Sequence, residues 1–484
     1  MINNVLIANR GEIAIRIIRT ASDLGISTTA IYSDDDSLSL HVRHADCALG
    51  LGAEGVPAYL DVERIISLAL EANCAAVHPG YGFLSESADF ASACETAGLI
   101  YVGPTAETLA RFGDKAAARD LAEQCGVPVL PGISQAVTAA QATDFINSLG
   151  SDGAVMLKAV AGGGGRGMRP VLAASEMDEA FTRASSEAMQ AFGSGDIYVE
   201  ELMSHARHVE VQILGDGTGA VSHLWDRECS LQRQRQKLIE VAPAFDLSDS
   251  LRNAMLDAAV KIGSAANYRG VGTIEFLVDQ QAKDRFVFME ANARLQVEHT
   301  VTEEVTGLDL VALQLKIAAG ATLADLQLEQ AQVPPTRGVA MQARVNLETM
   351  GPDGTSRPGG GHISAYEPPA GPGIRVDGFG YTGYTTSPHY DSLLAKLIVH
   401  GDDMEHVVRK TRRALAEFRL EGVRSNTGFL MTLLKHTKMT GDTVHTCYVE
   451  DNIADLMSEA DDRLRYFTAD RGIQKAGADV DPDD

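Results

Sequence analysis

Residues 1–24 read MINNVLIANRGEIAIRIIRTASDL and combine a short apolar run, VLIA at 5–8, with an amphipathic helix pattern from Glu12 to Leu24. Gly11 separates the two, and Gly25 ends the helix pattern. The alternation continues to about Asp114, with strand signals at 28–32, 47–49, 75–78 and 99–102 and helix signals at 60–73 and 85–97. Repeated units of this size predict an α/β domain with a doubly wound parallel sheet over residues 1–114.

The pattern changes from Lys115 onward. We expect helices at 115–125, 135–149 and 175–192 and strands at 127–130, 155–159, 167–172, 197–200, 207–214, 220–225, 271–278 and 285–290. Pro170 suggests that its strand lies at a sheet edge, because proline cannot donate to a ladder. Closely spaced strands joined by polar turns predict an antiparallel α+β domain over 115–334, with a mobile lid at about 130–204.

A linker with paired prolines, EQAQVPPTRG at 329–338, precedes the last part of the chain. Beyond it, strand signals at 338–346, 363–366, 373–377 and 393–400 and a helix signal at 404–420 predict a third, α+β domain over 335–449. Residues 450–484 form an acidic tail that we expect not to pack and that resembles a linker.

Composition limits the functional classes. The 484-residue chain carries a net charge of −25, which argues against binding to nucleic acid or to anionic membrane surfaces. No apolar stretch approaches the ~20 residues that a membrane helix needs. The N-terminus matches neither a secretory signal nor a transit peptide. Six cysteines without metal-like spacing are expected to be reduced thiols, so the expected location is the cytoplasm.

A glycine-rich turn, GGGGRG at 162–167, follows a predicted strand that contains Lys158. It formally satisfies G-x-G-x-x-G, but Met168 to Val171 cannot begin a good helix, so a dinucleotide fold is excluded. A glycine hairpin whose backbone amides close over phosphates fits better, with Lys158 as a nearby cation. The alternative is a flexible surface hairpin.

Acidic and amide side chains gather near the end of the central region. Glu275 and Glu290 lie on two strands of a predicted hairpin, and Asn292 follows; such oxygens suit Mg²⁺. Two solvated acids on a sheet rim are the alternative. If ANARLQVEHT (291–300) is an extended strand, Asn292, Arg294, Gln296 and Glu298 share one side of it. That pattern indicates an oxyanion site with a built-in base.

The segment DRECSLQRQRQKLIE (226–240) concentrates positive charge in an acidic chain. Its basic residues are Arg227, Arg233, Arg235 and Lys237, interleaved with glutamines that suit hydrogen bonding to oxyanions. A solvated charged face is the alternative explanation.

Together these segments resemble the biotin carboxylase family, the ATP-grasp component of biotin-dependent carboxylases such as acyl-CoA carboxylases. The resemblance runs from Ile2 to about residue 447. It is carried by IANRGEIAIRIIR (7–19), HPGYGFLSE (78–86), GPTAE (103–107), GDKAAAR (113–119), GGGGRGM (162–168), RHVEVQILGDG (207–217), EANARLQVEHTVTE (290–303) and YDSLLAKLIV (390–399). It implies an N-terminal biotin carboxylase domain, a central ATP-grasp domain with a mobile lid, and a C-terminal biotin carboxylase domain.

The resemblance also implies roles for individual residues. Those implied to hold the ATP phosphates and ribose are Lys115, Lys158, Gly164, Gly165, His208 and Gln232. Those implied to lie at adenine are Glu200, Glu201, Leu202, Met203 and, nearby, Arg235. The implied Mg²⁺ or Mn²⁺ ligands are Glu275, Glu290 and Asn292. The implied bicarbonate site comprises Lys237, Arg294, Gln296 and Val297, with Glu298 as the base, while Arg344 is implied to steady the enolate-like biotin.

The implied reaction is ATP-dependent carboxylation of biotin by bicarbonate through carboxyphosphate. The implied partners are a biotin carboxyl carrier and a carboxyltransferase, since no lysine is flanked as Met-Lys-Met and no such domains are seen. A homodimer is also implied. The sequence departs from the family at QRQRQK (232–237), where many members have QRRHQK, at Glu201 and Leu202, and after Arg344.

Two alternatives remain open at this point. One is another ATP-grasp ligase, such as a carbamoyl-phosphate-forming enzyme. The other is a catalytically silent nucleotide-binding subunit, which the departures from the family pattern keep open.

Overall fold

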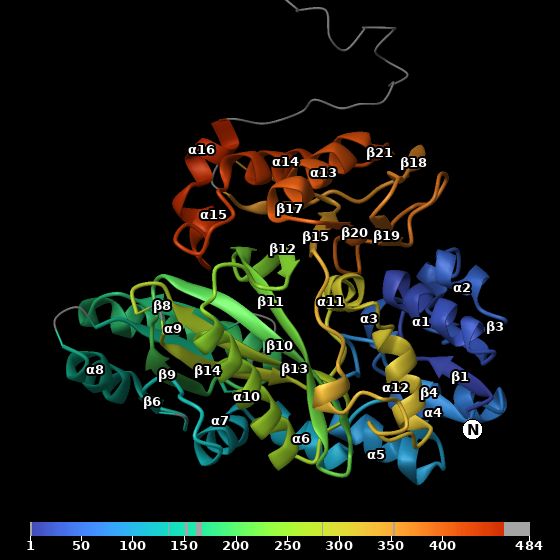
Figure 1. Ribbon diagram of the computed structural model, residues 1–484, viewed down its shortest axis with the longest axis horizontal. Helices are drawn as coiled ribbons and strands as arrows, with labels where there is room; N and C mark the ends of the chain where they lie inside the picture. Colours follow the sequence, from blue (N-terminus) through green and yellow to red (C-terminus); the bar gives the residue numbers. More distant parts are fainter. Residues whose placement is uncertain are drawn as a thin grey trace, which may run out of the picture.

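The computed structural model describes residues 2–133, 135–150, 153–160, 167–282, 284–351 and 354–458. The N-terminal sheet is parallel with strand order β3-β2-β1-β4-β5 (Figure 1). Its strands are β1 (Asn4–Ile7), β2 (Ser27–Tyr32), β3 (Cys47–Gly50), β4 (Ala76–His78) and β5 (Ile100–Tyr101). The first helices are α1 (Gly11–Asp23), α2 (Leu40–His44), α3 (Gly55–Ala58), α4 (Val62–Glu71), α5 (Ala88–Thr96) and α6 (Ala106–Gly113). The predicted parallel sheet is confirmed.

The strand order of this sheet reverses between β1 and β4. Loops that follow the two strands therefore leave the same edge, which is where ligands bind in open α/β sheets. Glu12, in the first turn of α1, and Tyr81, after β4, are joined by a hydrogen bond between their side chains at this edge.

An antiparallel sheet of eight strands runs through the centre, in the order β14-β13-β10-β11-β12-β15-β20-β19 (Figure 1). Its strands are β10 (Ala206–Asp216), β11 (Val221–Arg233), β12 (Gln236–Ala242), β13 (Arg269–Asp279), β14 (Phe286–Asn292), β15 (Val339–Asn346), β19 (Ile374–Gly378) and β20 (Leu393–Gly401). β12 pairs with β15, with Ile239 opposite Ala343, so the sheet continues across the predicted boundary at 334.

Helices and short hairpins flank this sheet. Met255 and Ile262 of α10 (Asp249–Ala265) and Val211 of β10 are fully buried in one hydrophobic core. The remaining helices are α11 (His299–Thr306), α12 (Leu310–Ala318), α13 (Met404–Glu417), α14 (Thr427–His436), α15 (Tyr448–Asp451) and α16 (Ile453–Ser458). The short strands are β16 (Glu348–Met350), β17 (Ser356–Pro358), β18 (Ala365–Glu367) and β21 (Arg419–Glu421).

A separate four-stranded sheet, in the order β6-β9-β7-β8, lies on the side of the molecule away from the N-terminal sheet (Figure 1). It comprises β6 (Gly132–Ile133), β7 (Val155–Ala159), β8 (Met168–Val171) and β9 (Ile197–Glu201), with α8 (Ala139–Ser148) and α9 (Met177–Phe192) packed on it and α7 (Lys115–Gln124) before it. β8 is an edge strand, as Pro170 predicts. This body matches the residues expected to form the lid, whose mobility stays a prediction.

One predicted strand, at 127–130, is wrong. Val127 donates its amide to Ala122 at the end of α7, and Pro128 has no amide to donate. Only a single bridge, Val129 to Phe288, remains of the expected pairing. Across the described ranges, no helix is both long and apolar enough to cross a membrane.

Candidate active site

A buried ammonium group stands at the centre of the site. Lys237 Nζ, on β12, donates to Glu298 Oε1 at 2.6 Å, to Glu210 Oε2 at 2.7 Å and to Glu275 Oε1 at 3.1 Å. Glu210 comes from β10, Glu275 from β13, and Glu298 from the turn before α11. Burial alone would lower the pKa of Lys237, but the three carboxylates outweigh it, so the pKa lies well above its usual value. The lysine therefore stays charged.

Glu298 is held between two cations. Besides Lys237, Arg344 on β15 donates Nη2 to Glu298 Oε2 at 3.0 Å. Burial would raise the pKa of this 1% exposed side chain, but Lys237 and Arg344 outweigh burial and the repulsion from Glu210, so its pKa is lowered. Glu298 is thus ionised at neutral pH and has an unprotonated carboxylate, as a general base needs.

Arg344 is shared by a second carboxylate. Its Nε donates to Glu240 Oε1 at 2.5 Å. Burial raises the pKa of Glu240, and although Arg344 lowers it, repulsion from Glu298 adds to the rise. The two acids around one guanidinium are therefore shifted in opposite directions, an arrangement typical of functional carboxylate pairs.

Three oxygen-bearing side chains converge beside this centre. Glu275 and Glu290 are directly opposite each other on β13 and β14, and Asn292 is the last residue of β14. Asn292 Nδ2 lies 2.9 Å from Glu275 Oε1 and 3.5 Å from Glu290 Oε1. Carboxylate and amide oxygens are the ligands that Mg²⁺ and Mn²⁺ take, so this set fits such an ion.

The expected extended strand from 291 to 300 is wrong beyond Asn292. β14 ends at that residue, and Glu298 sits in a turn as the residue before α11. Arg294 still contacts Asn292 Oδ1 at 3.0 Å and Gln296 Oε1 at 2.7 Å, but its carboxylate partner is Glu86 at 2.8 Å. The described ion pairs of Glu298 are with Lys237 and Arg344 rather than with its predicted neighbour Arg294.

The residues implied to bind phosphates lie on the other side of the carboxylates. Lys158 on β7 forms an ion pair with Glu200 on β9, and the charge of Glu200 raises the pKa of Lys158 against the effect of burial. Lys115, the first residue of α7, has a lowered pKa because of burial, although Glu290 opposes the shift. Gly164 and Gly165 lie outside the described residues. Buried Lys158 and half-buried Lys115 thus both interact electrostatically with Glu290.

His208 links this side to the carboxylates. Its Nδ1 lies 2.8 Å from Gln232 Nε2, so Nδ1 accepts from the amide and Nε2 carries the proton. Nε2 lies 2.9 Å from Glu275 Oε2, without the alignment of a hydrogen bond. Gln232 is therefore connected through His208 to Glu275, one of the predicted metal ligands.

Three family models match successive parts of the sequence. They are described as the biotin carboxylase N-terminal domain (residues 1–109), the carbamoyl-phosphate synthase L chain ATP-binding domain (114–326) and the biotin carboxylase C-terminal domain (342–451). In addition, the biotin carboxylase domain dimer of Hydrogenobacter thermophilus 2-oxoglutarate carboxylase, solved with MgADP, ADP and bicarbonate, has a TM-score of 0.89 at 39% identity, covering 94% of this chain and 99% of that one.

The chain belongs to the biotin carboxylase family. These proteins are ATP-grasp ligases that carboxylate biotin with bicarbonate and ATP. Pyruvate carboxylase of Aspergillus niger is 47% identical over 92% of this chain but only 37% of its own length, and human mitochondrial pyruvate carboxylase is 46% identical over 93% and 38%. A single-chain, multi-domain long-chain acyl-CoA carboxylase is also similar, at 41% identity. The chain spans less than two-fifths of the length of these curated relatives.

A buried lysine that no sequence motif assigned to the site also contacts it. Lys396 on β20 is fully buried and donates Nζ to the Val297 carbonyl at 3.1 Å, and it lies 3.1 Å from Glu12 Oε2. Lys396 therefore ties α1 and β20 to the turn that carries Glu298. Lys396 ends the motif YDSLLAK, which is part of the family resemblance. Nothing in that motif indicates that Lys396 contacts Val297.

The basic segment of this biotin carboxylase is not one binding patch. Arg227 is 0% exposed and pairs with Glu210, and Arg233 is 2% exposed and lies 3.5 Å from Glu348. Neither the oxyanion interpretation nor the solvated-face alternative holds for these two, because both side chains are buried and lie against carboxylates inside the protein. Of the four basic residues, Lys237 and Arg227 contact the carboxylate centre in the described contacts, Arg227 through Glu210 alone.

Arg235 lies in a two-residue hairpin turn between β11 and β12. Gln234 and Arg235 both have positive φ, 47° and 64°, in a turn of the kind that usually takes Asn-Gly. Arg235 Nη1 donates to the Met168 carbonyl at 3.0 Å, which connects the hairpin to β8 of the four-stranded sheet. The departure from the family pattern thus falls at a contact with the predicted lid.

The run implied to lie at adenine leaves β9 at its end. Glu201 and Leu202 donate their backbone amides to the carbonyls of Pro131 and Ala154, both at 2.8 Å. Both backbone amides are therefore already hydrogen-bonded within the protein. Met203 follows as a half-buried residue.

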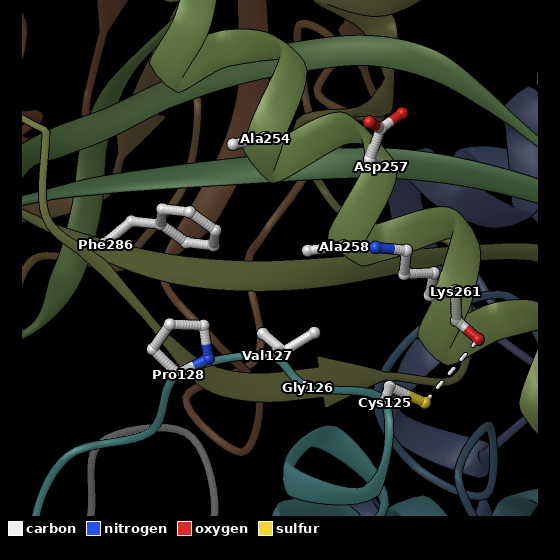
Figure 2. Close-up of a pocket in the computed structure, with 9 residues that line it drawn as sticks. All are labelled: Cys125, Gly126, Val127, Pro128, Ala254, Asp257, Ala258, Lys261 and Phe286. Carbon is white, nitrogen blue, oxygen red and sulfur yellow. Dashed lines mark hydrogen bonds between the residues drawn. The ribbon is translucent and has the colours of Figure 1, made fainter.

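A pocket of about 350 Å³ lies elsewhere, between the segment after α7 and α10 (Figure 2). Cys125, Val127, Ala258, Lys261 and Phe286 are among its lining residues. It contains none of the predicted site residues. The carboxylate centre around Lys237, rather than this pocket, is the candidate active site.

Proposed function

We propose that this chain carries out the ATP-dependent carboxylation of biotin by bicarbonate, the first half-reaction of a biotin-dependent carboxylase. The observation that carries the proposal is Glu298, a buried carboxylate held ionised by Lys237 and Arg344 next to the oxygen ligands Glu275 and Glu290. A base, a cation for an oxyanion and a metal-binding set stand together, as phosphoryl transfer to a small oxyanion requires.

In this proposal, bicarbonate lies against Lys237, Arg294 and Gln296 and the backbone of Val297. Glu298 removes its proton, and a bicarbonate oxygen then attacks the γ-phosphorus of ATP. The bond from that phosphorus to the bridging oxygen breaks, which releases ADP and gives carboxyphosphate. Lys237 and Arg344 are already in position to stabilise the negative charge that develops. Such stabilisation is the protein's main contribution, because phosphoryl transfer needs little covalent chemistry from it.

The nucleotide and its ion meet a second group of residues. Glu275, Glu290 and Asn292 would hold Mg²⁺ or Mn²⁺, which neutralises charge on the phosphate oxygens. Lys115 and Lys158 would contact phosphates, with Gly164 and Gly165 as backbone donors and His208 and Gln232 at the ribose side. Residues 200–203 and Arg235 would border adenine. We also propose that residues 130–204 close as a lid, which protects carboxyphosphate from water.

Arg344 would then act on biotin. Carboxyphosphate breaks down to CO₂ and phosphate, the phosphate removes the ureido proton, and the biotin anion attacks CO₂. The guanidinium of Arg344, already 3.0 Å from Glu298, would stabilise the negative oxygen of that anion. The same residue would therefore connect the two steps of the reaction.

The remaining assignments complete the proposal. Biotin would reach the site on a carrier protein or domain, and a carboxyltransferase would pass the carboxyl group to the final acceptor, as multi-domain relatives suggest. We propose a homodimer, by similarity to the dimeric domain of the 2-oxoglutarate carboxylase. The six free thiols support a reducing, cytoplasmic location. The domain ranges 1–114, 115–334 and 335–449 are retained as a proposal. The expectation that the chain does not pack from residue 450 onward is wrong for the described start of the tail, because Leu456 of α16 lies in the C-terminal hydrophobic core.

ATP hydrolysis by the purified chain, with Mg²⁺ and with or without bicarbonate and free biotin, tests the proposal. Hydrolysis that requires bicarbonate and rises with biotin supports it. Hydrolysis that is indifferent to bicarbonate refutes it and favours another ATP-grasp ligase or a silent nucleotide-binding subunit.

A further inference from the structure

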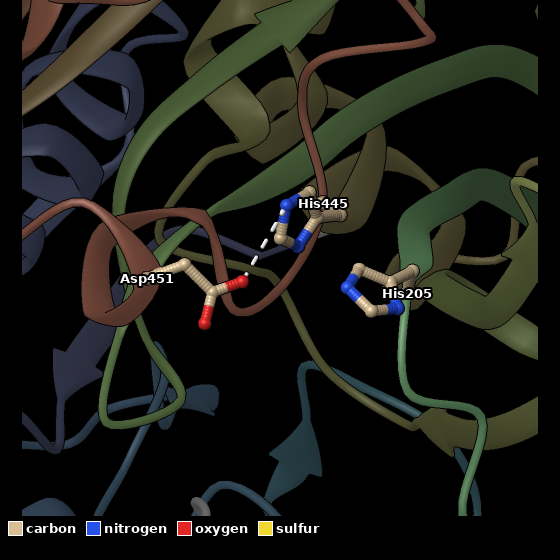
Figure 3. A group of neighbouring side chains, drawn as sticks. All are labelled: His205, His445 and Asp451. Atoms are coloured by element: carbon tan, nitrogen blue, oxygen red, sulfur yellow. Dashed lines mark ion pairs between the residues drawn. The ribbon is translucent and has the colours of Figure 1, made fainter.

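A cluster of metal-ligating side chains lies outside the carboxylate centre. His205, His445 and Asp451 offer one ligand atom each, and these atoms all lie within 4.8 Å of one another (Figure 3). His205 precedes β10, His445 precedes α15, and Asp451 ends α15. Residues 240 positions apart in the sequence therefore meet at one point.

The two imidazoles face each other. Their ring centroids are 5.0 Å apart, and His445 Nε2 lies 3.8 Å from Asp451 Oδ2. The other ring nitrogen of His445, Nδ1, is buried and has no hydrogen-bond partner, and Figure 3 shows it on the side of the His205 ring. A buried nitrogen without a partner is costly, so this position calls for a ligand or an ion.

The backbone around the cluster is fixed before any ion arrives. The Gln280 amide donates to the His205 carbonyl at 3.3 Å, and the Gln280 side chain donates to the Val444 carbonyl at 2.8 Å. Thr446 also donates its amide to the Ala206 carbonyl at 2.9 Å. One side-chain and two main-chain hydrogen bonds thus hold His205 and the residues next to both histidines, which lowers the ordering cost of binding.

Charge and ligand type select the class of ion. His205 and His445 each offer an imidazole nitrogen, and Asp451 offers a carboxylate oxygen. Two imidazoles with one carboxylate suit zinc and its neighbours rather than Mg²⁺, which prefers oxygen.

The spacing is also close to what such an ion needs. Ligands about 2.1 Å from a tetrahedral ion stand about 3.4 Å from each other, so the cluster must contract by roughly 1 Å. His205 is exposed and the Asp451 side chain is 51% exposed, so both are free to make that adjustment by rotation.

We propose that His205, His445 and Asp451 form a binding site for a divalent transition-metal ion of the zinc class, separate from the proposed magnesium site. The ion clamps α15 to the start of β10. Glu450 of α15 already accepts from the Gln234 amide at 2.6 Å, so the clamp also supports the hairpin that carries Arg235. The open positions of the ion are left to water.

Cobalt(II) serves as the spectroscopic probe, titrated into the chelator-treated chain in excess Mg²⁺. The C47S/C447S background removes the two exposed thiols, which bind such ions on their own. We expect one equivalent to bind with the strong visible absorption of a tetrahedral ion, and Zn²⁺ to displace it. H205A and D451N, both at exposed positions, should each weaken binding by more than about 100-fold, since losing even an outer partner of a ligand costs about 10–100-fold.

Two matched controls separate this site from others. H44A removes another exposed histidine, and E290Q alters the proposed magnesium site; both should bind cobalt as the parent does. Zn²⁺ should also raise the thermal unfolding midpoint of the parent but not of H205A. The proposal is overturned if cobalt does not bind stoichiometrically, or if H205A and D451N bind it as tightly as the parent. This holds whatever the outcome of the bicarbonate-dependent ATPase test.

Discussion

Replacing Glu298 by glutamine isolates the charge of the proposed base. The side chain is 1% exposed and contacts Lys237 at 2.6 Å and Arg344 at 3.0 Å. Glutamine keeps its size and one acceptor oxygen but cannot take a proton from bicarbonate. We therefore expect folding to survive and carboxylation to fail.

The magnitudes follow from the charges around the site. Four buried carboxylates, Glu210, Glu240, Glu275 and Glu298, face three cations, Arg227, Lys237 and Arg344. Removing one carboxylate leaves three charges of each sign, so no cation is left without a partner and the stability cost should be only about 1–2 kcal/mol. Loss of a general base should reduce the rate by about 10²–10⁴-fold, or roughly 3–5 kcal/mol of barrier.

The assay is bicarbonate-dependent ATP hydrolysis with free biotin, measured together with urea unfolding. Glu303→Gln is the matched control, because Glu303 is also a buried acid between two arginines, Arg16 at 2.6 Å and Arg375 at 2.9 Å, on α11 itself. The control should lose similar stability and keep its activity within about twofold. If E298Q stays within about threefold of the parent rate, Glu298 is not the base.

Three further outcomes are expected. Lys237→Gln leaves three buried carboxylates without their shared cation, so unfolding free energy measured in urea should fall by about 3–5 kcal/mol and activity should be lost; a stable variant contradicts the charge argument. Glu290→Gln should raise the Mg²⁺ concentration for half-maximal ATPase at least about tenfold, whereas an unchanged requirement excludes it as a ligand. Burial raises the pKa of Glu12 from 4.5 to about 7, so its contribution to stability is present below pH 4.5 and lost as pH rises to 7. Between pH 4.5 and pH 8, the unfolding free energy measured in urea should fall by about 3 kcal/mol less for E12Q than for the parent. An equal fall in both proteins would show that Glu12 is ionised at both pH values.

The fold was largely predictable because its signals are local. Apolar runs and helix periods in residues 1–114 predicted the parallel sheet, and Pro170 predicted an edge strand. Strand 127–130 failed because Pro128 lacks an amide and Val127 caps α7. The continuous sheet from β12 to β15 could not be foreseen, since pairing across a long linker depends on three-dimensional packing.

The candidate site was predictable in its residues but not in its contacts. Alternation along a strand selected Asn292, Arg294, Gln296 and Glu298, but β14 ends at Asn292 and the other three residues follow it outside any strand. The pairing of Glu298 with Lys237 and Arg344 was not predicted. Lys237 comes from another strand, and its distance to Glu298 depends on how the sheet and α11 pack.

The sequence by itself determined the family, the chemical types at the site and the order of strands and helices, because these depend on residue identity and short-range periodicity. Only the tertiary structure decided which acid meets which base. It showed that Lys237 is shared by three carboxylates, that Arg227 is a buried partner of Glu210, and that Lys396 supports Val297. The physical reason is that electrostatic coupling depends on distance and burial, and both are set by contacts between residues far apart in the chain.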